Sequence, residues 1–372
     1  MLIARYKKSV FLMASFLVVL SPVSFAGNQG HYYPGVTAIR DVVQPPKGVY
    51  FAEYDPYYHA GVFKDENGND LNHISKSGDL TRNINISGPL GGGVNVPVTL
   101  SGTFDVDIDT QVDMVIQQPS FLWSTGLKIL GLNHAMLLAV PFGYTRIDIK
   151  AQADAAGTIS LGNILNRPIT ASQTVEIKDE KYGMGDLYFV PVWLAKTGKR
   201  YDTGVNYGFF APTGAYDEGD VANVGFGFWT HQWQANGVYY LNDIKATGLM
   251  LNTTYELHSY NYQKDVRPGQ NFTLEYGISQ YLHERVEIGV ASSHQWQISE
   301  DAGEQAVNTG VKDRINAVGG QLTLWPMKGK FMVVGKCNWE YGGVDRPEGL
   351  MSSVNLTWIF GEPITEKLKK IT

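Results

Sequence analysis

The sequence is poor in cysteine and in charged residues. Its 372 residues include one cysteine, Cys337, which excludes an intrachain disulfide, a paired-cysteine metal knuckle and an iron–sulfur cluster. Charged residues make up 18 % of the chain, below the roughly 25 % of ordinary soluble domains. The formal net charge is −6 and there is no basic stripe, so we expect no nucleic-acid partner.

Long apolar runs are also missing beyond the N-terminus, so the sequence predicts no membrane-spanning helix. The chain starts with basic residues between positions 5 and 8, an apolar run over 10–20 and the small-x-small triplet Ser24-Phe25-Ala26. This pattern is typical of a cleaved secretory signal peptide over residues 1–26, with an uncleaved anchor as the rival interpretation. We therefore expect an exported protein.

Apolar and polar side chains alternate with a period of two through much of the chain, and helical periodicity is scarce. The pattern is clearest in 271–279, 285–298, 330–341 and 353–360. A strand sorts such side chains onto two faces, whereas a helix would scatter them. Together with less regular segments, this predicts about twelve strands, an even number that is typical of single-chain outer-membrane barrels.

Short and long connections alternate between the predicted strands. Tight turns are expected at Thr197-Gly198, 242–244 and Leu282-His283, and long polar loops at 212–223 and 299–312. Turns on one side and loops on the other are typical of an up-and-down antiparallel transmembrane β-barrel. In lipid every backbone polar group needs a partner, so the sheet must close.

The all-β interpretation divides the chain into consecutive parts. We expect a signal peptide over 1–26, a periplasmic N-terminal segment over 27–48, an outer-membrane barrel over 49–360 and a periplasmic tail over 361–372. The barrel would contain a long outer loop over 60–110. A loop of this length could constrict the lumen, cap its mouth or remain a surface loop.

The polar strand faces should line the lumen if the apolar faces meet lipid. Charges of both signs in a narrow lumen are expected to pair, which lowers their desolvation cost. Such a lining is either a polar plug or the wall of a passage, and Tyr50, Tyr54 and Phe210 would add aromatic surface. The candidate lumen-lining residues are Glu256, His258, Glu275, Arg285, Glu287, Lys330, Lys336, Asn338 and Glu340.

Catalytic signatures are missing from the sequence. There is no Gly-x-Ser-x-Gly elbow and no Walker A loop, and the run 283–287 departs from the zinc-binding helix motif. We expect no enzyme activity, no metal and no cofactor. Glu256 and His258 share one strand face, so a barrel hydrolase stays as an alternative that requires a serine–histidine contact of about 3 Å.

Short motifs rich in turn residues stand between positions 45 and 229. They are Pro45-Pro46-x-Gly48, Gly185-Asp186-Leu187 with Pro191, and Ala211-Pro212-Thr213-Gly214 followed by Tyr216, Asn223, Gly225 and Trp229. This set resembles the phenol meta-pathway degradation-type outer-membrane proteins. The resemblance implies an outer-membrane barrel that takes up hydrophobic or aromatic compounds, without catalytic residues.

The sequence thus predicts a passive outer-membrane channel for small hydrophobic or aromatic solutes. Its expected partners are outer-membrane lipid, the solute and the barrel-assembly machinery, which recognises a terminal aromatic residue such as Phe360. A plugged barrel that acts as a surface scaffold or adhesin is the alternative.

Overall fold

The computed structural model describes residues 30–87, 93–161, 165–307 and 309–360. The predicted signal peptide and the tail over 361–372 lie outside these residues. Within the described part, no helix is long and apolar enough to span a membrane.

The regular elements form one 15-stranded antiparallel sheet. The strands are β1 (Gly48–Phe63), β2 (His73–Ser87), β3 (Gly93–Ile129), β4 (Leu132–Ala139), β5 (Phe142–Leu161), β6 (Leu165–Met184), β7 (Leu187–Thr197), β8 (Tyr201–Ala211), β9 (Thr230–Tyr240), β10 (Thr247–His258), β11 (Asn271–His283), β12 (Val286–Gln297), β13 (Arg314–Met327), β14 (Phe331–Val344) and β15 (Pro347–Ile359).

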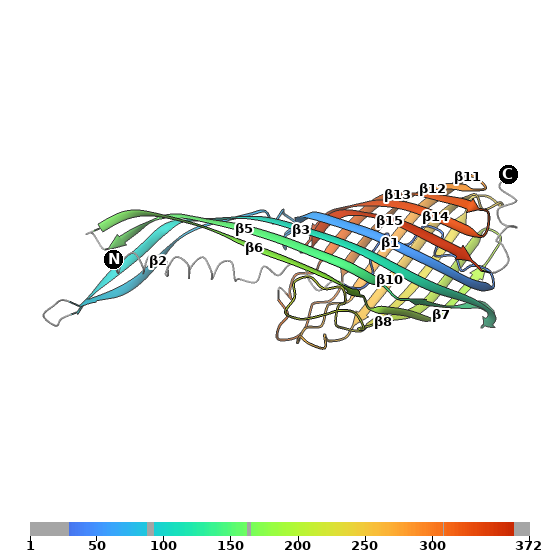
Figure 1. Ribbon diagram of the computed structural model, residues 1–372, viewed down its shortest axis with the longest axis horizontal. Coiled ribbons are helices and arrows are strands. Elements are labelled where there is room, and N and C mark those ends of the chain that lie inside the picture. Colours follow the sequence, from blue (N-terminus) through green and yellow to red (C-terminus); the bar gives the residue numbers. More distant parts are fainter. Residues whose placement is uncertain (1–29, 88–92, 162–164, 308, 361–372) are drawn as a thin grey trace. The chain divides into compact units, whose positions relative to one another are not determined.

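Twelve of these strands close into a barrel, as the sequence predicts. Strands β7 to β15 are neighbours in chain order, and β4, β3 and β1 complete the ring (Figure 1). Strand β1 pairs with β15 on one side, where Tyr50 lies opposite Ile359, and with β3 on the other, where Tyr50 lies opposite Leu122. The first and last strands of the barrel therefore share a hydrogen-bonded seam.

The connections alternate as expected between tight turns and longer loops. The β3–β4 turn consists of Leu130 and Gly131, which both have positive φ angles, of 52° and 79°. The loops before β9, β11 and β13 are longer. The β14–β15 connection is tight, in contrast, and Asp345 at its centre has a φ of 51°.

The barrel is polar inside and apolar outside. On β10, Asn252, Thr254 and Glu256 are at most 2 % exposed, whereas Leu249 and Leu251 on the opposite face are 40 % and 54 % exposed. A water-soluble protein buries its leucines instead. An apolar outer face on a closed barrel is the arrangement of an outer-membrane protein, and the chain has that fold and that location.

A second compact unit contains 70–110 and 148–178. Strand β2 pairs with the first part of β3 from Ser87↔Gly93 to His73↔Asp107. Val106, Ile108 and Ala153 form its small apolar cluster.

The prediction of a loop over 60–110 is therefore wrong, because this range contains the end of β1, all of β2 and the first half of β3. Phe104, Val106 and Ile108 alternate with polar residues in the first part of β3, and this strand pattern was not recognised in the sequence.

Candidate functional site

The structure places most of the predicted lumen residues on the inward faces of the barrel strands. Glu340 is half-buried there, and its carboxylate accepts a hydrogen bond of 2.8 Å from the Tyr58 hydroxyl. The buried members of the set are Glu256, His258, Glu275, Glu287, Lys336 and Asn338.

Arg285 and Lys330 do not line the lumen, contrary to the prediction. Both side chains are exposed, in the β11–β12 and β13–β14 turns respectively. Each predicted strand begins one residue too early, since β12 begins at Val286 and β14 at Phe331. A residue in a turn no longer follows the two-residue period of the strand.

The N-terminal segment, defined here as residues 30–47, lies inside the lumen. Its contacts are with inward-facing residues of strands that are far apart in the chain. Five of these residues are predicted lumen residues: Glu256, Glu275, Glu287, Lys336 and Asn338. The sequence predicts a periplasmic segment over 27–48, but the described part of that range contacts the inward faces of the barrel strands instead. No long apolar run or charge cluster in the sequence marks it as a plug.

Side chains of the barrel strands form hydrogen bonds with the backbone amides and carbonyls of this segment. The Gly35 amide donates to Glu275 Oε1 at 2.7 Å, and the Gly35 carbonyl accepts from Asn338 Nδ2 at 3.0 Å. The Ile39 amide donates to Gln321 Oε1 at 2.9 Å, and the Val36 carbonyl accepts from Asn355 Nδ2 at 3.1 Å. The inward amides and carboxylates thus replace the backbone partners that an irregular segment lacks.

Arg40 anchors the segment at the end of the barrel that carries the tight turns. Its guanidinium forms an ion pair with Glu287 and donates at 3.0 Å to each of the carbonyl oxygens of Lys245 and Ala246. It also lies 4.7 Å from the centre of the Tyr281 ring, a cation–π contact. Every nitrogen of this guanidinium is therefore engaged by the barrel.

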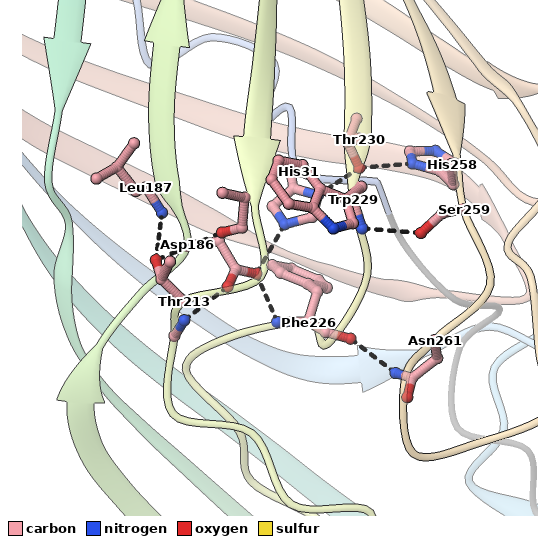
Figure 2. Close-up of polar contacts among 12 residues, drawn as sticks. His31, Asp186, Leu187, Thr213, Phe226, Trp229, Thr230, His258, Ser259 and Asn261 are labelled. Carbon is pink, nitrogen blue, oxygen red and sulfur yellow. Dashed lines mark hydrogen bonds and ion pairs between the residues drawn. The ribbon is translucent and has the colours of Figure 1, made fainter.

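His31 anchors the segment at the other end (Figure 2). Its Nε2 donates to Asp186 Oδ2 at 2.8 Å, and its Nδ1 lies 2.6 Å from the Thr230 hydroxyl. The same hydroxyl lies 2.8 Å from His258 Nδ1. Asp186 also accepts from the amides of Gly214 and Phe226, at 2.8 and 2.7 Å, which fixes the loop before β9.

This network does not have the form that the hydrolase alternative requires. Among the described residues no serine hydroxyl is hydrogen-bonded to a histidine. The hydroxyl in contact with His31 and His258 is that of Thr230, which is completely buried. Thr230 lines neither of the two cavities of the barrel interior. A nucleophile needs room for the attacked group beside it. We therefore assign the network to holding His31.

Two cavities lie beside the N-terminal segment. The turn-side cavity has a volume of about 230 Å³ and is lined by Tyr50, Tyr281 and Trp325 among others. The loop-side cavity has a volume of about 180 Å³ and includes Tyr188 and Phe210 in its lining. The aromatic surface expected from Tyr50, Tyr54 and Phe210 is therefore present in these cavities.

The charged residues of the cavity walls have partners within the protein. Arg40 pairs with Glu287, and Lys245 pairs with Asp202 at 3.0 Å. Asp41 accepts from the Ala38 amide at 2.9 Å. Within the described part of the chain, no group of three or more histidine, cysteine or acidic side chains is placed to hold a metal ion.

Sequence reasoning missed the residues that hold the segment. Asp186 belongs to the Gly185-Asp186-Leu187 motif, one of those that carry the family resemblance. The motif singles out the residue, but it does not show that Asp186 binds His31. Its partner His31 lies 155 residues away in the chain. A contact over that separation leaves no periodic signal in one sequence.

Comparison with solved structures gives the same fold. A crystal structure of an outer membrane channel from Pseudomonas putida F1 is 13 % identical, with a TM-score of 0.52 over 89 % of this chain and all of that one. A FadL homologue from Pseudomonas aeruginosa is 10 % identical, with a TM-score of 0.34 over 92 % of this chain and 97 % of that one. The second score is too low to carry an argument.

No curated protein matches the chain. A family model matches residues 94–356, which is more than half of the sequence. The chain belongs to the family described as "Putative MetA-pathway of phenol degradation".

Proposed function

We propose that the protein is a passive outer-membrane channel that takes up small hydrophobic or aromatic solutes. The observation that carries the proposal is the pair of cavities inside the closed barrel, whose walls are mostly apolar and rich in aromatic side chains. Pockets of this kind bind apolar molecules and use few polar groups to orient them. Diffusion down a gradient requires only that the solute binds weakly enough to leave.

Uptake into vesicles that contain lipopolysaccharide tests this function. We expect toluene to enter vesicles with the folded protein faster than protein-free vesicles, at a rate proportional to the gradient and independent of any energy source. Gas chromatography of the collected vesicles measures the uptake. Equal rates with and without the protein would contradict the proposal.

A plugged barrel that acts as a surface scaffold is the second candidate. The hydrogen bonds that tie residues 30–47 to the strands favour it, because they hold the segment inside the lumen. The two functions differ in the same experiment, since a sealed barrel gives no uptake above the rate of protein-free vesicles.

A further inference from the structure

We infer that the two cavities are successive parts of one route for neutral single-ring solutes, and that Tyr54 determines the largest solute that passes between them. The inference rests on the proposed function and goes further by naming the path, the constriction and the solute class.

The two cavities adjoin each other. Five residues line both: Asp41, Tyr54, Ser120, Leu137 and Trp193. A side chain that borders two cavities stands between them, so these residues form the partition. Four of them come from the neighbouring strands β1, β3, β4 and β7, and Asp41 comes from the N-terminal segment.

The partition is formed jointly by the barrel wall and the N-terminal segment. The Tyr54 hydroxyl on the barrel wall donates to Asp41 Oδ2 on the N-terminal segment at 3.4 Å, near the limit for a hydrogen bond. Asp41 is held independently by the Ala38 amide. The tyrosine ring is therefore the part of the partition that can move aside while the segment stays in place.

Size and charge define the solute class. A cavity of about 150 Å³ lined by apolar side chains holds one benzene ring. Volumes of about 180 and 230 Å³ thus accept one ring with small substituents in each cavity. In the walls, Arg40 is paired with Glu287 and Lys245 with Asp202, and Asp41 accepts hydrogen bonds from the Ala38 amide and the Tyr54 hydroxyl. An ion would therefore enter without a compensating charge that is not already engaged.

The inward and outward faces of β3 provide a matched pair of variants. Ser120 is 2 % exposed and lines both cavities, whereas the next residue, Phe121, points outward and is 51 % exposed. Ser120→Trp fills the partition and Phe121→Trp changes only the lipid-facing surface. Ser120→Leu is a milder substitution in case the larger ring prevents folding.

The experiment measures uptake of toluene and of the two-ring solute naphthalene into the same vesicles. We expect the unmodified protein to take up toluene about tenfold faster than naphthalene, a size discrimination typical of hydrophobic pockets. Tyr54→Ala should remove most of this difference by raising the naphthalene rate. Ser120→Trp or Ser120→Leu should lower both rates, and Phe121→Trp should leave them unchanged.

Two results would overturn the inference. Unchanged rates in both Ser120 variants would mean that solutes follow another path, and unchanged selectivity in Tyr54→Ala would mean that Tyr54 does not set the size limit. Both results leave the channel function standing. Failure of the unmodified protein to take up toluene would instead remove the proposed function.

Discussion

The ion pair between Arg40 and Glu287 joins the N-terminal segment to the barrel and is largely enclosed. The side chains of Arg40 and Glu287 are 17 % and 2 % exposed. Removing one partner of such a pair leaves the other charge desolvated, at a cost of about 3–5 kcal/mol. The pair therefore controls how firmly the turn-side end of the segment is held.

Arg40→Met should loosen this end of the segment and raise the ion conductance of the barrel in planar bilayers. The physical reason is that Glu287 then draws water and counter-ions into the lumen. Arg285→Met is the control, because Arg285 is exposed in a turn and has no role in the lumen. Equal conductance in both variants would contradict the assigned anchor.

The buried carboxyl group of Asp313, which precedes β13, should make the stability of the adjoining loop depend on pH. Burial and the nearby Asp301 and Asp345 raise its pKa to about 6, and Arg346 only partly opposes this. A carboxyl group whose pKa is raised on folding destabilises the folded state as it ionises. The described part of the loop before β13, residues 298–307 and 309–313, should therefore lose up to about 3 kcal/mol of stability as the pH rises from about 4 to about 6.

Hydrogen exchange of this loop, corrected for the intrinsic rate, measures the effect. Protection should fall between pH 4 and pH 6.5 in the unmodified protein and should stay constant in Asp313→Asn. An equal fall in the variant would show that another group is responsible.

At the scale of single residues, the alternation of polar and apolar positions predicted the buried lumen residues within strands, such as Glu256 and Glu287. It was wrong at Arg285 and Lys330, where the strand has given way to a turn. Periodicity identifies a face only inside a regular element.

At the scale of elements, the loss of stability caused by a charge on the lipid-facing surface should depend on how far along the strand it lies. Leu251 lies in the middle of the strand and is 54 % exposed, and Leu282 lies at the end of β11 and is 63 % exposed. Leu251→Arg should destabilise the barrel by about 2–4 kcal/mol and Leu282→Arg by about 0–1 kcal/mol.

Folding into lipid vesicles under a urea titration measures both values. The two leucines are similarly exposed, so the comparison isolates depth in the membrane from the loss of a leucine. Equal destabilisation would contradict the assignment of this face to the bilayer core.

The strands that sequence analysis predicted best are those with one apolar face, such as β11 and β12. Strand β2, which pairs with β3, was not predicted, although Leu80, Ile84 and Ile86 alternate with polar residues along it. The interior location of residues 30–47 escaped for another reason, since it depends on side chains spread over the whole barrel.

At the scale of the whole molecule, closure depends on the seam between β1 and β15. Ala52 lies opposite Thr357 in this seam. Opposed residues of antiparallel strands have Cα atoms about 4.5–5.5 Å apart, within reach of a disulfide, whereas diagonal neighbours are about 7–8 Å apart.

With Cys337→Ser as background, the pair Ala52→Cys and Thr357→Cys should form a disulfide in the folded protein. The pair Ala52→Cys and Asn355→Cys should not, because Asn355 is displaced by two residues along the strand. Mass spectrometry of proteolytic fragments detects the cross-link. Efficient cross-linking of the second pair would mean that the register is different.

The position of residues 30–47 has a consequence for the timing of folding. Val36 is hydrogen-bonded to Asn355, 319 residues further along the chain, and Gly35 to Asn338, 303 residues further along. Contacts of such high sequence separation are slow to form because the intervening chain must first be ordered. We therefore expect the earliest part of the described chain to be among the last to find its place, so that a nascent barrel passes through a stage in which its interior is still open to water.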